Sequence, residues 1–150
     1  MIKKLLLTPL LLGFATMAVH ADEAAGKAAY MLCAACHNPD GTGLPIGDKK
    51  MAPSLVGSKV ITGDASVLAL VVLKGIKKEG TEYIGIMAPL EAAFADDQKL
   101  ADVLTYVRSS FGNTAAAVSA EDVAKFRVQW KDEKEPVTRA KLAELTKPAE

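Results

Sequence analysis

The chain has 150 residues, with 18 basic and 18 acidic side chains and a formal net charge of zero. A balanced charge lacks the basic excess typical of nucleic-acid binding, so we expect no nucleic-acid partner. Half of the residues are hydrophobic, and the length suits one compact domain with short terminal segments.

Residues 1–21 have the pattern of a secretory signal peptide, with Lys3 and Lys4 before an apolar run at 5–19 and a cleavage site ending at Ala21. The run of about 15 residues is shorter than the ~20 that a membrane-spanning helix needs. We therefore expect export and cleavage near Ala21, which leaves 129 residues with 16 basic and 18 acidic side chains. An uncleaved membrane anchor is the alternative.

The five residues 33–37 read Cys-Ala-Ala-Cys-His, a pattern typical of covalent attachment of a c-type haem. Two thiols separated by two residues can each form a thioether to one vinyl group of the same porphyrin, and the adjacent imidazole can bind the iron. Cys33 and Cys36 are therefore the candidate attachment residues for a single haem c, and His37 is the candidate first axial ligand.

The rest of the composition narrows this interpretation. These are the only two cysteines, and the other histidine, His20, lies in the predicted signal peptide. The mature chain then lacks the second histidine for bis-histidine ligation and the four ligands of a usual zinc site. A thioredoxin-like dithiol expects a preceding apolar strand, whereas residues 24–35 are rich in alanine and favour a helix. A redox dithiol and an unligated cysteine pair stay open as alternatives.

The periodicity predicts an all-α chain with no strand signal. Glycines and prolines indicate loops at 38–58 and over most of 74–95, with one helical turn at 91–94. Gly112-Asn113 is expected to adopt a left-handed conformation that ends the helix starting at Asp96 or Asp97. Helices are expected at 23–35, at 65–73, from Asp96 or Asp97 to Phe111, from the capping signal at 119–122 to Trp130, and at 139–145.

A low-spin electron carrier needs a sixth iron ligand, and cleavage leaves Met31, Met51 and Met87. Met31 is held on the proximal side by its proximity to Cys33. Met51 follows His37 by 14 residues, in a loop that must first leave the proximal face. Met87 follows a buried helix and can return over the opposite face, so we expect it to be the distal ligand. An open or lysine-ligated site and Met51 are the alternatives, and either methionine can simply fill the core.

The order of these features resembles the class I cytochromes c. The resemblance covers about residues 23–112 and includes Pro-x-Leu-x-Gly at 53–57 and a methionine followed two residues later by proline at 87–89. It implies an all-α fold wrapped around one covalent haem, with domain bounds of 22–112. It also implies that the Pro53 carbonyl accepts a hydrogen bond from His37, which would fix the imidazole.

The same resemblance implies that the first and last helices of the domain cross through small and aromatic residues, which here are Gly26, Tyr30, Val103, Leu104 and Tyr106. Residues 113–150 exceed the minimal family pattern and are expected to form a C-terminal helical extension. This tail resembles extensions on some bacterial cytochrome domains that serve dehydrogenases. Its simplest role is structural, with Phe126 and Trp130 covering apolar surface of the haem domain; a partner-binding arm is the alternative.

The resemblance also implies one-electron transfer rather than catalysis, because an iron with two axial ligands has no open position for substrate. Haem attachment on the outer face of the membrane implies a periplasmic location. We expect a carrier between a dehydrogenase or quinol-oxidising complex and a terminal acceptor, which meets the membrane only through its partners or an uncleaved signal. The alternatives are a permanent cytochrome subunit of a dehydrogenase or oxidase complex, and a haem enzyme or gas-binding protein with an open distal site.

Charge is distributed unevenly along the chain. The middle is rich in lysine and is followed by an acidic stretch; the lysines are Lys49, Lys50, Lys59, Lys74, Lys77 and Lys78. The lysine-rich stretch is either an ordinary solvated surface or a docking patch for an acidic redox partner.

Overall fold

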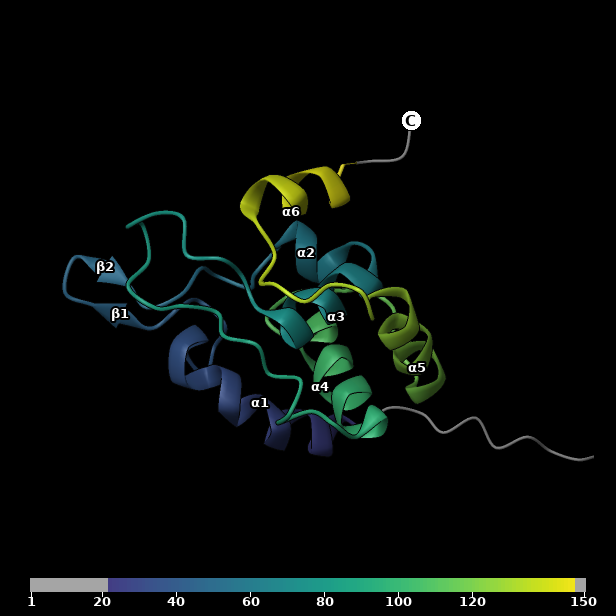
Figure 1. Cartoon of the computed structure of the whole chain (residues 1–150). Helices are drawn as coiled ribbons and strands as arrows, with labels where there is room; N and C mark the ends of the chain where they lie inside the picture. Colours follow the sequence, from purple (N-terminus) through teal and green to yellow (C-terminus); the bar gives the residue numbers. More distant parts are fainter. Residues whose placement is uncertain (1–21, 148–150) are drawn as a thin grey trace, which may run out of the picture.

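The computed structural model describes residues 22–147 as six helices and one short hairpin (Figure 1). This confirms the predicted all-α class, and the predicted signal peptide lies outside the described residues. None of the described helices is long and apolar enough to cross a membrane. The elements are α1 (Glu23–His37), β1 (Pro45–Ile46), β2 (Lys49–Lys50), α2 (Lys59–Thr62), α3 (Ala65–Lys74), α4 (Asp97–Ser109), α5 (Ala120–Gln129) and α6 (Arg139–Leu145).

Aspartates cap three of the helices. Asp22, Asp64 and Asp96 stand just before α1, α3 and α4, and each side chain accepts hydrogen bonds from backbone N–H groups of the first turn. α3 and α4 begin where the sequence predicted. α1 runs two residues beyond its predicted end, to His37, so the whole Cys-Ala-Ala-Cys-His stretch is helical.

The expectation of no strand was wrong at one point. β1 and β2 pair antiparallel, with Pro45 opposite Lys50 and Ile46 opposite Lys49. Gly47, at φ +61°, and Asp48 form the two-residue turn between them, which is a usual hairpin connection. Strands of two residues are too short to show an alternating pattern, so periodicity could not reveal them. The four-residue helix α2 was missed for the same reason.

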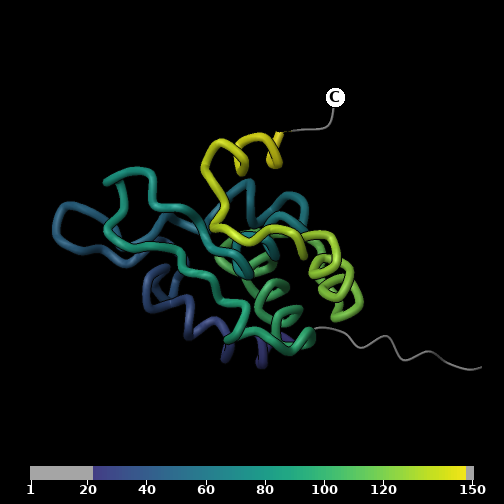
Figure 2. Tube along the Cα trace, in the orientation of Figure 1, coloured from purple at the N-terminus to yellow at the C-terminus, as the bar shows by residue number. Residues whose placement is uncertain are grey.

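α1 crosses α4 at close range, as the resemblance predicted (Figures 1 and 2). A Cβ atom placed on Gly26 would lie 2.4 Å from the Asp102 carbonyl oxygen, so a side chain does not fit there. Next to this contact, the Tyr30 ring centroid lies 5.4 Å from that of Tyr106 and 5.2 Å from that of Phe111. Aromatic rings at this spacing add to the burial energy of the crossing.

The end of α4 differs in detail from its prediction. The helix ends at Ser109, and the left-handed residues are Phe111 at φ +59° and Gly112 at φ +81°. Asn113 uses its side chain instead: its amide nitrogen donates to the Val107 carbonyl at 2.9 Å and to Leu55 at 3.2 Å. This buried amide therefore ties the end of α4 to the loop before α2.

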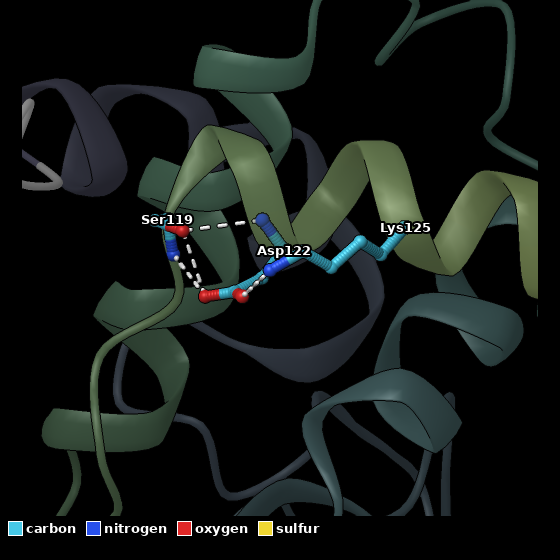
Figure 3. A network of polar contacts seen from close by, with 3 residues as sticks. All are labelled: Ser119, Asp122 and Lys125. Atoms are coloured by element: carbon cyan, nitrogen blue, oxygen red, sulfur yellow. Dashed lines mark hydrogen bonds and ion pairs between the residues drawn. The ribbon is translucent and has the colours of Figure 1, made fainter.

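The C-terminal extension packs along α3 and α4 rather than projecting from them. α5 begins with a capping box, in which Ser119 and Asp122 exchange hydrogen bonds and Lys125 lies within 3.4 Å of the same carboxylate (Figure 3). The Trp130 indole donates to the Ser66 carbonyl at 2.9 Å. α6 lies on the opposite side of the molecule from α1 (Figure 1), and its Leu142 packs in one cluster with Val67, Leu70 and Val71 of α3.

Candidate functional site

A cavity of about 340 Å³ lies among α1, α3, α4 and the two long loops. Most of its wall is aliphatic, which favours an apolar occupant. The aliphatic residues from α3 and α4 are Leu68, Val71, Val72, Val103, Leu104 and Val107. Cys33, Cys36 and His37 enter the wall from the last turn and a half of α1.

Two backbone hydrogen bonds attach the loop after α1 to the end of the Cys-Ala-Ala-Cys-His motif. The Cys36 carbonyl accepts from Leu44 N at 2.9 Å, and the His37 carbonyl accepts from Gly43 N at 2.8 Å. Both cysteines are free and half-buried. Burial, with a smaller contribution from Cys36, raises the pKa of the Cys33 thiol to about 11, so this sulfur is an uncharged thiol at neutral pH.

His37 has the orientation that the resemblance predicted. Its Nδ1 lies 3.0 Å from the Pro53 carbonyl oxygen. A carbonyl can only accept, so Nδ1 carries the proton and Nε2 keeps its lone pair. Burial lowers the pKa of His37, while the bond to Pro53 acts in the opposite direction. The imidazole is thus neutral at neutral pH and has its metal-binding nitrogen free.

The Pro53 segment is itself fixed at two points. Leu55 N donates a hydrogen bond to the Gly41 carbonyl at 2.7 Å. The Asn113 side chain accepts from Gly57 N at 2.9 Å and donates to the Leu55 carbonyl. These bonds hold the carbonyl of Pro53 in place for His37. The sequence gives no local signal for this role of Asn113, because the loop that it supports lies more than 50 residues earlier in the chain.

Met87 lines the cavity from the loop after α3. Its carbonyl accepts from Ile76 N at 2.8 Å, and a Cβ atom on Gly75 would lie 2.4 Å from the same oxygen. Three residues later, Leu90 N donates to the Val72 carbonyl at 3.0 Å. The backbone on either side of Met87 is therefore attached to the end of α3.

Met51 lines the same cavity, although the sequence predicts that its loop must first leave the proximal face. Its backbone N–H donates to the Leu44 carbonyl at 2.8 Å, and its carbonyl accepts from Gly85 N at 2.8 Å. The structure therefore brings both candidate methionines to the cavity, and only Ile86 separates Gly85, which bonds to Met51, from Met87. Met31 is 63% exposed and does not line the cavity.

Two cavity residues had no signal in the sequence. Tyr83 comes from the second loop, and Arg139 comes from the first turn of α6. The Arg139 guanidinium lies 6.0 Å from the centroid of the Tyr83 ring. Arg139 is 102 residues beyond His37, in a segment outside the family resemblance, and no spacing rule connects the two.

Several lysines of the lysine-rich stretch already have bonding partners for their ammonium groups. Lys74 forms an ion pair with Glu91 at 2.7 Å, and only 13% of its side chain is exposed. Lys49, Lys50 and Lys78 donate to backbone carbonyls of nearby loops. Lys59 and Lys77 are exposed, and among residues 22–147 neither has a recorded side-chain bond.

The helical fold and a cavity lined by two cysteines, a histidine and two methionines define a class I cytochrome c. The family model for cytochrome c matches residues 23–111, and the chain belongs to this family. It is an electron-transfer protein that carries covalently bound c-type haem and its iron. The residues present fit this cofactor, because the cavity combines thiols, an imidazole and thioether sulfurs with a mostly aliphatic wall.

Named relatives fall into two groups. Cytochrome c-552 of Thermus thermophilus is 29% identical over 136 residues, which are 85% of this chain and 88% of that protein. The cytochrome c subunit of alcohol dehydrogenase (quinone) from Gluconobacter oxydans is 37% identical over 69% of this chain, and the fructose dehydrogenase cytochrome subunit from Gluconobacter japonicus is 36% identical over 79%. The matches span only 22% and 24% of those two subunits.

Proposed function

We propose that this chain is a periplasmic one-electron carrier whose haem is attached through Cys33 and Cys36 and whose iron is bound by His37 and Met87. The observation that carries the proposal is that one cavity holds the oriented imidazole of His37 and the anchored Met87. The haem supplies the exchange between Fe(III) and Fe(II). The protein's residues would orient the ligands and place a mostly aliphatic wall around the ring.

Met87 is the better candidate for the distal ligand because of where each methionine is attached. Met51 N bonds to Leu44, whose own N–H bonds to Cys36, so Met51 belongs to the loop that returns under the motif. Met87 is attached to Ile76 and Gly75, at the end of α3. We infer that Met51 packs at the rim against Gly85, from whose ideal Cβ position its sulfur lies 3.0 Å.

The test is a pair of variants in the haem-loaded protein. Met87→Ala should remove the weak sulfur-to-iron absorption band of the ferric state and lower the midpoint potential on the order of 0.1 V, since axial ligands govern haem potentials over ~0.8 V. Met51→Leu keeps side-chain volume and should leave band and potential nearly unchanged. Loss of the band in Met51→Leu together with its retention in Met87→Ala would reverse the assignment.

A second candidate is a permanent cytochrome subunit of a dehydrogenase. The supporting observation is that several relatives are named as cytochrome subunits of alcohol, gluconate and fructose dehydrogenases. Size-exclusion chromatography of a native periplasmic extract, followed by haem staining, separates the two cases. A free carrier elutes at the mass of a single chain with haem, whereas a subunit elutes with a dehydrogenase.

The mass of the purified chain also tests cleavage after Ala21.

A further inference from the structure

The three arginines of the chain have different surroundings. Arg108 donates to the carbonyls of Ile61 and Gly63, both at 2.8 Å, and is buried. Arg127 forms an ion pair with Asp97 at 2.6 Å. Arg139 lines the haem cavity, and within the described part of the chain its guanidinium has no recorded hydrogen-bond acceptor or ion-pair partner.

The position of Arg139 is fixed independently of its guanidinium. Its backbone N–H donates to the Glu79 carboxylate at 2.7 Å, and it begins α6 after the Thr138 cap. Just before it, Val137 N donates to the Gly75 carbonyl at 3.0 Å, and the Val137 carbonyl accepts from Lys77 N at 2.9 Å. The extension is thus attached directly to the segment that also holds Met87.

The cavity wall near Arg139 is polar and carries excess positive charge. Lys77, Lys78 and Tyr83 line it together with a single carboxylate, Glu79, which already caps the Arg139 backbone. The Lys78 ammonium is used by the carbonyls of Ile84 at 3.2 Å and Gly85 at 3.1 Å. Among the described residues Lys77 is also free, but its ammonium is a single point charge, whereas the Arg139 guanidinium offers a planar fork of donors that matches a carboxylate.

We propose that Arg139 binds a propionate carboxylate of the haem, so that the C-terminal extension is part of the cofactor site. This inference rests on the haem site proposed above. Haem has two propionates and no other anionic side groups, and because the propionates lie at the edge opposite the vinyl groups, attachment at Cys33 and Cys36 would direct them away from α1. An ion pair partly shielded by the Tyr83 ring would offset propionate charge that otherwise stabilises Fe(III).

The test compares midpoint potentials of Arg139→Gln, Arg139→Lys and a matched control. Arg139→Gln should shift the ferric–ferrous equilibrium toward the ferric state by about threefold to tenfold, up to ~59 mV for a one-electron couple. Arg139→Lys should recover much of the shift, because the charge returns. Lys131→Gln removes the same charge from an exposed position of the extension that does not line the cavity, and it should change nothing.

Two outcomes would overturn the proposal: an Arg139→Gln potential equal to that of Lys131→Gln, or an Arg139→Lys potential equal to that of Arg139→Gln. Resonance Raman spectra give a second readout, because loss of the ion pair should shift the propionate bending mode in Arg139→Gln alone. Retention of the sulfur-to-iron band in all three variants distinguishes this result from a failure of the axial assignment, which only the Met87 variant tests.

Discussion

Replacing Gly26 with alanine tests the crossing of α1 and α4, on which the placement of the haem motif depends. The added Cβ would lie 2.4 Å from the Asp102 carbonyl oxygen and 2.8 Å from the Tyr106 Cβ atom. Neither atom can rotate away, since one belongs to the backbone and the other is the root of a buried side chain. The two helices must therefore separate, and the aromatic contacts beside Gly26 must open with them.

Two opposing terms set the size of the expected change in the free energy of unfolding. Overpacking of a closely packed contact costs roughly 1–3 kcal/mol. Alanine in a helix interior is favoured over glycine by about 1 kcal/mol, and this gain applies to Gly26 because it lies inside α1. Since the closest contact is with fixed backbone, we take the upper part of the overpacking range. Gly26→Ala should therefore lower the free energy of unfolding by about 1–2 kcal/mol.

Guanidinium chloride unfolding of the haem-loaded protein, followed by Soret absorption and Trp130 fluorescence, measures this change. With a slope of about 4 kcal/mol/M, the midpoint should fall by roughly 0.3–0.5 M. Lys27→Ala is the control, because it changes an exposed position of the same helix and should leave the midpoint nearly unchanged. A Gly26→Ala midpoint equal to or above that of wild type would refute a tight crossing.

Other predictions concern charge and capping. Lys77→Glu should slow electron transfer to an anionic partner severalfold at low ionic strength, and the effect should fade at physiological salt, where the field of an exposed charge is screened over about 8 Å. If stopped-flow rates of the variant and the wild type are equal at every salt concentration, Lys77 is ordinary surface. Ser119→Ala should destabilise the protein by about 1 kcal/mol in thermal unfolding at pH 7. Hydrogen bonds from Ser119 lower the pKa of Asp122 below 3.8, so the ionised carboxylate of the capping box adds stability above that pH. The difference in stability between Ser119→Ala and the wild type should therefore shrink as the pH falls through the folded-state pKa of Asp122. An undiminished difference in acid would contradict this account.

The sequence predicted the elements whose signals are local. Asp96 before an apolar repeat placed α4, and Ser119 with Asp122 placed α5, because capping is decided within one turn. The hairpin at Gly47 escaped prediction because two-residue strands have no period. Arg139 escaped because its place at the cavity depends on a backbone bridge between Ile76 and Val137, which are 61 positions apart.

Met51 shows why the distal side was the hardest part to predict. From the sequence, the two loops are expected to follow separate paths on two faces of the haem. In the structure, however, Lys50 and Tyr83 form a bridge, and Gly85 N bonds to the Met51 carbonyl. The first loop is therefore an anchor for the second. Residues 83–87 are tied to the hairpin at one end and to α3 at the other, and the extension bonds to Gly75 and Lys77 at that second anchor. Under the proposed assignment, Met87 stands in a loop held at both ends and would lose little freedom on binding iron, which favours a persistent sixth ligand over an open site.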